Sequence, residues 1–156
     1  MPIDGIRRTA PSPRARLHLS LLGIRRHRDL PARSTLRRWV GMALGNDASI
    51  TLVFVDRRAA RRLNRQFRAR DYATNVLTFA YQMRPRVVAD IVLCLPVLRR
   101  EARLQGKTLR EHLAHLVLHG VLHAQGHDHA KRREAQKMEK LERHLLARLR
   151  IPDPYV

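Results

Sequence analysis

The sequence predicts a single α+β domain, in which a mixed sheet of about four strands packs with about five helices around a central helix that carries histidines. Three observations support this prediction. Short apolar and β-branched runs alternate with longer segments of helical periodicity. Residues that cap helices stand where those segments begin. The chain has 156 residues, of which 44% are hydrophobic, and this is enough to form one core.

The expected domain spans residues 16–150. Residues 1–15 are rich in proline and arginine, so we expect a basic, disordered extension there. Residues 151–156 are expected to form a C-terminal tail.

The four expected strands differ in how their apolar residues are arranged. At 17–21, leucines alternate with polar or small residues, as in a strand with one buried face. Residues 49–55 are β-branched and apolar, which favours a buried strand. Two further strands are expected at 75–79 and 87–93, and the second is dense enough in Val, Ile and Leu to be central.

Capping residues and apolar stripes define the helices. The five expected helices cover residues 34–44, 56–67, 96–104, 108–124 and 131–150. Ser34 and Asp56 are expected to cap the first two. Thr108, with Glu111 three residues later, forms a capping box at the start of the histidine helix. The last helix carries an expected core-facing stripe of Ala135, Met138, Leu141, Leu145 and Leu149.

The net charge indicates a polyanionic partner. The chain has a formal charge of +19, which favours binding to nucleic acid. Only four of its 32 basic residues are lysines, and arginine pairs with phosphate in a bidentate way. Charge alone does not locate the contact surface. The aromatic content of 4% argues against a stacking platform for single strands.

Composition also bounds the compartment. No apolar run approaches the roughly 20 residues that a membrane span needs, and residues 1–16 lack the apolar core of a secretory signal. We therefore expect a cytoplasmic protein. The lone cysteine, Cys94, excludes an internal disulfide and lies in an apolar run, so we expect a buried, unreactive thiol.

A run of histidines at 119–129 indicates a metal site. His119 and His123 are four residues apart, so on a helix their side chains lie on one face. Gly126 is expected to end this helix and turn the chain back, bringing His127 or His129 to the same ion. Three imidazoles with one open position are typical of a catalytic zinc site.

Hydrogen-bonded core histidines are the alternative explanation. The four histidines between residues 112 and 123 would fall within an arc of about 80° on a helix that is otherwise apolar. Buried imidazoles without partners are costly to desolvate, and a metal relieves that cost. We therefore favour the metal site.

The spacing of His119, His123, Gly126 and His129 is also that of the metzincin proteases. In those enzymes a glutamate that acts as general base follows the first histidine, whereas here the residue is Gly120. Loss of a general base typically costs about 10²- to 10⁴-fold in rate. Protease activity is therefore disfavoured.

The run at 119–129 resembles the signature of the YbeY family, zinc-dependent endoribonucleases and rRNA maturation factors of bacteria. Two further blocks resemble that family in order and spacing, namely 63–79 and 89–94. The resemblance extends over roughly residues 17–150 and leaves out the arginine-rich start.

The resemblance implies one zinc ion with a bound water, held by His119, His123 and His129. It also implies that Arg68 lies near the metal, where a guanidinium can bind the scissile phosphate. No general base is evident, so either zinc-bound hydroxide or the RNA 2′-hydroxyl could be the nucleophile.

The residues around the expected ligands are given lesser roles. From spacing alone His127 competes with His129, and the family pattern favours His129 as the ligand. Asp128 is expected either to orient a ligand imidazole or to form a turn. His115 is expected behind the ligands or in the core, and His112 nearer the helix surface.

For function, the resemblance implies a single-strand-specific endoribonuclease in rRNA processing, acting on the 3′ end of 16S rRNA, in ribosome biogenesis and in ribosome quality control. The implied partners are ribosomal RNA and the small subunit, with ribosomal or GTPase assembly proteins as further candidates. A non-catalytic RNA-binding assembly factor with structural zinc is the alternative, and a metalloprotease is a weaker one.

Overall fold

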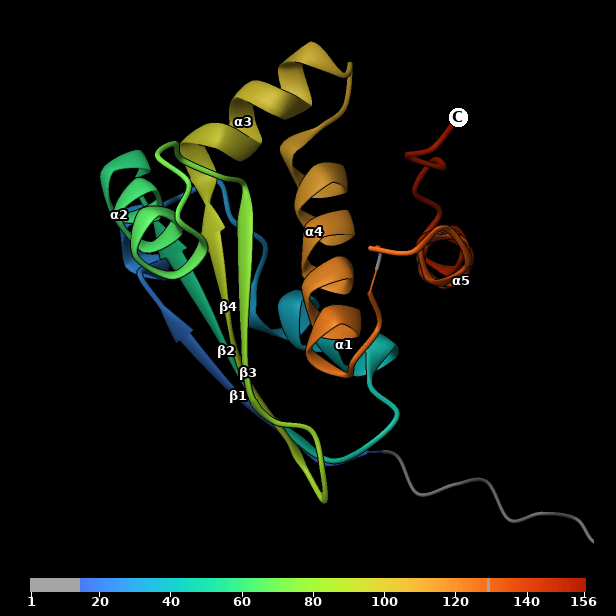
Figure 1. Ribbon diagram of the computed structural model, residues 1–156. Coiled ribbons are helices and arrows are strands. Elements are labelled where there is room, and N and C mark those ends of the chain that lie inside the picture. Colours follow the sequence, from blue (N-terminus) through green and yellow to red (C-terminus); the bar gives the residue numbers. More distant parts are fainter. Residues whose placement is uncertain (1–14, 129) are drawn as a thin grey trace, which may run out of the picture.

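The computed structural model describes residues 15–128 and 130–156. The strands are β1 (Leu17–Leu22), β2 (Ala48–Val55), β3 (Val76–Gln82) and β4 (Val87–Cys94). The α-helices are α1 (Arg33–Ala43), α2 (Arg57–Arg68), α3 (Leu95–Leu104), α4 (Leu109–Ala124) and α5 (Arg132–Arg148), and a short 3-10 helix covers Ile24–Arg26. The predicted α+β class is confirmed, with its mixed sheet and its central histidine helix (Figure 1). Residues 1–14 of the expected extension lie outside the described residues.

The sheet has the strand order β1-β2-β4-β3, in which the first three strands are parallel and β3 is antiparallel to β4. β4 is central, as its Val, Ile and Leu content predicts. Val55 at the end of β2 pairs with Cys94 at the end of β4, so the two strands end at the same edge of the sheet. Helices α2 and α3 leave from this edge (Figure 1).

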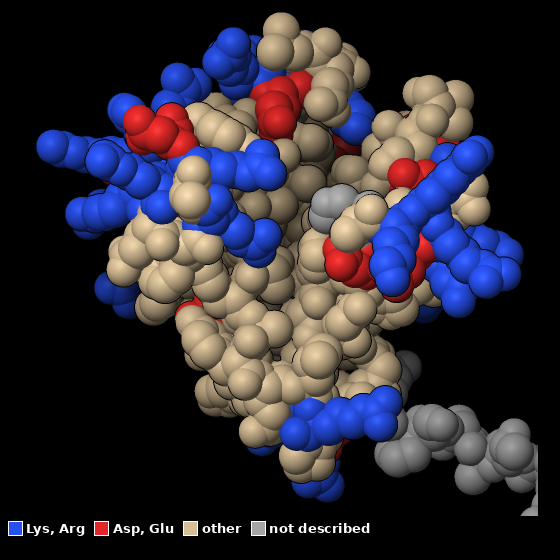
Figure 2. Space-filling view, viewed as in Figure 1, with Lys and Arg blue, Asp and Glu red and all other residues tan. Residues whose placement is uncertain are grey.

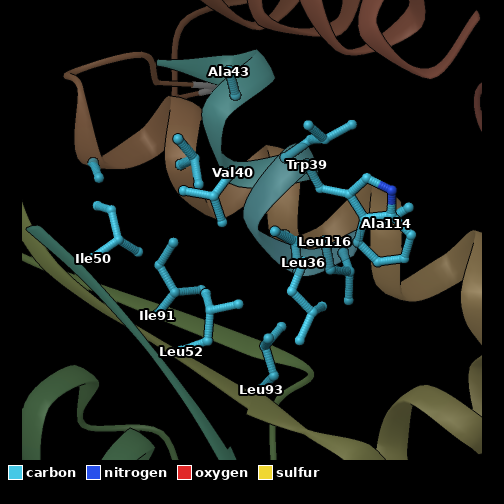
Figure 3. Packing of buried hydrophobic residues seen from close by; sticks show 14 of the residues in the cluster. Leu36, Trp39, Val40, Ala43, Ile50, Leu52, Ile91, Leu93, Ala114 and Leu116 are labelled. Atoms are coloured by element: carbon cyan, nitrogen blue, oxygen red, sulfur yellow. The ribbon is translucent and has the colours of Figure 1, made fainter. Parts of the chain in front are cut away.

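Helix α4 lies between the sheet and α5, with α1 packed beside it (Figure 1). Its apolar residues are buried all round, because both sides of the helix are covered. Leu36 and Val40 of α1 pack over Ile50, Leu52 and Ile91 of the sheet (Figure 3). Cys94 is 1% exposed, which agrees with the expected buried thiol.

Local capping signals predict two helix starts correctly. Asp56 Oδ1 accepts a hydrogen bond from Ala59 N at 2.8 Å, and Thr108 Oγ1 accepts one from Glu111 N at 3.1 Å. The Glu111 carboxylate also accepts from the Thr108 hydroxyl, at 3.0 Å. α4 is therefore fixed at its start by its own sequence.

The expected cap at Ser34 is wrong, because α1 begins at Arg33 with Ala32 at the N-cap and no side-chain cap. The guanidinium of Arg33 instead donates to the carbonyl of Leu19, which ties the start of the helix to β1. A long-range contact here replaces the local signal.

The expected stripe of α5 is correct except at one turn. Leu141 is 37% exposed, whereas its neighbour Glu142 is 0% exposed. Met138 and Leu146, four residues to either side of Glu142, are buried with it. The helix therefore turns a carboxylate toward α4 where the apolar pattern predicts a leucine.

Among the described residues, none of the helices has the length and apolarity that crossing a membrane requires.

Candidate metal centre

A cleft of about 330 Å³ lies between α4 and the segment that runs from α2 into β3. His119 and His123 of α4 line one wall, and Arg68, the last residue of α2, lines the other. In Figure 2 this face is hollowed between a group of Lys and Arg side chains over α2 and the surface over α5. The fold thus brings Arg68 and two of the three predicted metal ligands to one site.

His119 and His123 lie one turn apart on α4, and both are half-buried. Their ring centroids are 5.3 Å apart with an interplanar angle of 76°. The helix ends at Ala124, and Gly126 has φ +94°, as expected of the glycine that stops it. His127 N donates to the carbonyl of Leu122 at 3.2 Å, which closes the turn. His129 lies outside the described residues, so its role as third ligand stays a prediction.

Behind His119 stands the buried carboxylate of Glu142. Its Oε1 is 2.5 Å from His119 Nδ1, and its Oε2 is 2.9 Å from His115 Nε2. The hydroxyl of Tyr155 donates to the same Oε2. Burial raises the pKa of Glu142, but the hydrogen bonds from His115, His119 and Tyr155 outweigh it and lower the pKa to about 2. Glu142 is therefore ionised at neutral pH.

An ionised Glu142 determines which nitrogen of His119 carries the proton. The Nδ1–H donates to the carboxylate, so Nε2 is the nitrogen with the lone pair. A carboxylate that orients a histidine in this way is the usual arrangement behind a metal-ligating imidazole. The donor set thus fits a divalent metal such as zinc on the cleft side of His119.

A second arrangement of ligands is also present. One ligand atom each of His115, His119 and Glu142 lies within 4.8 Å of the others, close enough to share an ion. The separations of 2.5 and 2.9 Å from Glu142 to the two imidazoles are hydrogen-bond lengths, however. We therefore interpret Glu142 as a hydrogen-bond acceptor for His115 and His119.

Gly120 faces the sheet at close range. A Cβ atom at this position would lie 2.8 Å from Cγ2 of Ile91 on β4. A glutamate, the general base of the metzincin pattern, has no space there unless the Ile91 side chain moves. The packing of α4 on the sheet thus supports the argument against protease activity.

His112 is 4% exposed, so the expectation that it lies nearer the helix surface is wrong. Glu101 of α3 reaches over the start of α4, and its Oε1 is 3.1 Å from His112 Nε2. Burial lowers the pKa of His112, against the opposing effect of Glu101. The same carboxylate accepts from Asn75 Nδ2 at 3.0 Å, and Asn75 lines the cleft.

The remaining neighbours take up different positions. His115 lies behind His119, against Glu142, as one of its two expected placements. Asp128 Oδ1 accepts from Ala130 N at 3.2 Å, as in a turn. His127 lines a different cavity, together with Met83 and Gln125.

Sequence reasoning missed Glu142 and Tyr155. A signal for Glu142 was present, because a charged residue stands four residues from both Met138 and Leu146 in an apolar stripe. No pattern marks Tyr155, which reaches the site only because the chain folds back after α5.

The comparisons with known proteins identify the family of the chain. The family model for Endoribonuclease YbeY matches residues 31–150. Proteins named Endoribonuclease YbeY from Polaromonas sp. strain JS666 and Delftia acidovorans are 54% and 52% identical to this chain. Those alignments cover 85% and 83% of this chain and 87% and 86% of the relatives.

The solution structure of TM1509 from Thermotoga maritima matches the fold with a TM-score of 0.54 and 26% sequence identity, over 85% of this chain and 91% of that one. The resemblance seen in the three sequence blocks is confirmed. The chain belongs to the YbeY endoribonuclease family.

Proposed function

We propose that the chain is a metal-dependent endoribonuclease that cleaves single-stranded RNA in the cytoplasm. Its proposed substrate is ribosomal RNA, at the 3′ end of 16S rRNA, in ribosome biogenesis and quality control. The observation that carries the proposal is that Arg68 shares one cleft with His119 and His123. The names of the relatives support the endonuclease activity.

The proposed metal is one zinc ion on His119, His123 and His129. When bound, such an ion can lower the pKa of a coordinated water or polarise a phosphoryl oxygen. The chain itself supplies orientation, since the Glu142 carboxylate holds Nδ1 of His119 at 2.5 Å. Gly120 offers no titratable group, so the residue at this position supplies no general base.

Arg68 is proposed to bind the scissile phosphate. It is exposed at the end of α2, and its planar guanidinium can form two parallel hydrogen bonds to phosphate oxygens. Charge that develops on those oxygens during cleavage strengthens the same bonds. Arg70 lines the cleft beside it and adds a second cation.

The exposed arginines of α2 support RNA as the substrate. Six arginines lie on this helix, and all of them are exposed: Arg57, Arg58, Arg61, Arg62, Arg65 and Arg68. They form a basic surface beside the cleft (Figure 2). Binding through such contacts weakens steeply with salt. His119 is half-buried, so a phosphodiester must bend into the cleft, and an unstacked single strand does so more readily than a duplex.

The test uses the purified full chain, zinc and a labelled RNA with the 3′-end sequence of small-subunit rRNA, both single-stranded and in a matched duplex. We expect cleavage of the single strand only, and loss of cleavage in Arg68→Ala and His123→Ala. Arg38→Ala, at an exposed position of α1, and His127→Ala are the matched controls, because neither residue lines the cleft. A 2′,3′-cyclic phosphate product would identify the RNA 2′-hydroxyl as the nucleophile.

A zinc-loaded wild type that binds this RNA and never cleaves it would reject the proposal. That result would favour a non-catalytic assembly factor instead. If wild type and His129→Ala bound zinc in equal amount, the proposal that His129 is the third ligand would be rejected.

A further inference from the structure

The last residues of the chain fold back onto the metal centre. After α5, Ile151 N donates to the carbonyl of Leu146 at 3.0 Å, which turns the chain toward α4. Arg143 Nε binds Asp153 Oδ2 at 2.9 Å, and Tyr155 N donates to Asp153 Oδ1 at 2.8 Å. The segment 151–156, which was expected to form a C-terminal tail, is held by polar contacts to α5.

These contacts place the two ends of Tyr155 in different surroundings. The ring of Tyr155 lies under the guanidinium of Arg143, with 5.2 Å between the ring centroid and the Arg143 Cζ atom, and Tyr155 is 38% exposed. The hydroxyl points inward, where it donates to Oε2 of Glu142 and lies 3.3 Å from His115 Nε2. A tyrosine that served only to cover apolar surface would not need to direct its hydroxyl onto a buried carboxylate.

We propose that Tyr155 is a positioning residue of the metal centre, because its hydroxyl holds Glu142 in the orientation that fixes the ring of His119. This inference rests on the proposed metal site at His119 and His123. It adds the C-terminal segment to the part of the chain that the site requires.

The carboxylate geometry explains why the hydroxyl is needed. Glu142 is 0% exposed, so its oxygens must obtain hydrogen bonds from the protein. Oε1 receives Nδ1–H of His119, while Oε2 receives Tyr155 and His115. Without the Tyr155 hydroxyl, His115 is the one donor of these three that still contacts Oε2. Rotation of the carboxylate to recover a second donor would then move Oε1 away from His119.

The hydroxyl is a donor over the whole working range of pH. Burial and the hydrogen bond to Glu142 raise the pKa of Tyr155, so the phenol stays protonated.

The experiment compares Tyr155→Phe with Tyr81→Phe in the full chain. Tyr155→Phe keeps the ring contacts and removes only the hydroxyl. Tyr81→Phe removes a similar bond, from Tyr81 to Asp90 Oδ2 at 2.8 Å, on an exposed part of β3 that does not line the cleft. Zinc affinity is measured by competition with a chelator, and the imidazole Nδ1–H resonance of His119 is followed by NMR.

We expect Tyr155→Phe to weaken zinc binding by about tenfold, the lower end of what loss of an orienting partner costs. We expect no change in Tyr81→Phe. Equal zinc affinity in wild type and Tyr155→Phe would overturn the proposal, and so would an unchanged Nδ1–H resonance. Unfolding of both metal-free variants in urea shows whether a loss of affinity merely follows a loss of stability.

A double variant tests the route through Glu142. Glu142→Gln alone is expected to weaken zinc binding, and adding Tyr155→Phe should then cost little more, because both changes break one chain of contacts. Full additivity would overturn the proposal, and so would complete loss of zinc in Glu142→Gln, which would make Glu142 itself a ligand. Zinc affinity does not depend on cleavage, so a wild type that binds zinc without cutting RNA would reject the nuclease and leave this inference intact.

Discussion

The two walls of the cleft are built in opposite ways. The α4 wall carries half-buried histidines, backed by a carboxylate that is fully buried and accepts three hydrogen bonds. The wall formed by the end of α2 carries Arg68, which is exposed on a helix whose arginines face solvent. The histidine wall is fixed by packing and buried hydrogen bonds, whereas the other wall presents an exposed guanidinium.

This difference matches what each wall would bind. A metal ion requires ligands at set distances and angles, so preorganised histidines serve it best. A phosphate on a flexible strand arrives in many orientations, and a long exposed guanidinium can follow it. The fixed wall should therefore control metal content, and the exposed wall should control catalysis and RNA binding without affecting the metal.

The largest effect is expected on the fixed wall, from His123→Ala. Loss of a metal ligand should reduce cleavage by at least about 10³-fold, since a metal supplies several kcal/mol of charge stabilisation. Zinc content, measured by atomic emission, should fall in parallel. His127→Ala is the control, because His127 lines a different cavity. Full zinc content in His123→Ala would contradict the proposal that this wall holds the metal.

On the exposed wall, Arg68→Ala should lower kcat by about 10²-fold with zinc content unchanged. Arg68→Lys should recover only part of the rate, since lysine keeps the charge but not the paired donors. In Arg62→Ala, also on α2, RNA affinity should weaken slightly and its salt dependence should decrease by about one unit of slope. Loss of zinc in Arg68→Ala would show that the two walls are not independent.

A third change tests the packing behind the fixed wall. Gly120→Ala should lower the free energy of unfolding by about 1 to 3 kcal/mol, because its Cβ would lie 2.8 Å from Ile91 Cγ2. Gly41→Ala on α1 is the matched control, since nothing lies within 4 Å of a Cβ there. That change should raise stability by about 0.5 to 1 kcal/mol through helix propensity. Urea unfolding measures both, and equal shifts would show that α4 can move off the sheet.

The smallest effect is expected at an ion pair of the exposed wall, where Arg61 Nε binds Asp71 Oδ1 at 2.8 Å. The hydrogen bond from Arg61 lowers the pKa of Asp71. Any stabilisation is therefore present above the ordinary pKa of aspartate, about 3.9, and is lost as the pH falls through the lowered value. Asp71→Asn should thus differ from wild type at pH 7 less than Gly120→Ala does, and the difference should vanish in acid. The measurement is the urea unfolding midpoint of both proteins across pH 2 to 7, in steps of about one unit. A difference at pH 7 as large as that of Gly120→Ala would show that the ion pair contributes more to stability than expected.

Local signals account for what the sequence predicted well. Asp56 and Thr108 cap helices through bonds to residues three positions away, and Gly126 ends α4 through its own backbone. The errors arise where contacts with residues distant in the sequence determine whether a side chain is buried. The buried His112 bonds to Glu101 of α3, and the buried Glu142 bonds to residues of α4 and the C-terminal segment. The prediction that Arg68 lies near the metal came from the family resemblance and not from the spacing of residues. The role of His129 as third metal ligand remains a prediction.

The close contact between Gly120 and Ile91 also bears on how this protein can evolve. Gly120 is the residue at which the metzincin pattern differs from this chain. A mutation to glutamate would overpack the core against Ile91 on β4, and truncation of Ile91 alone would leave a cavity there. The route from one metal chemistry to the other therefore passes through a less stable variant whichever of the two positions changes first.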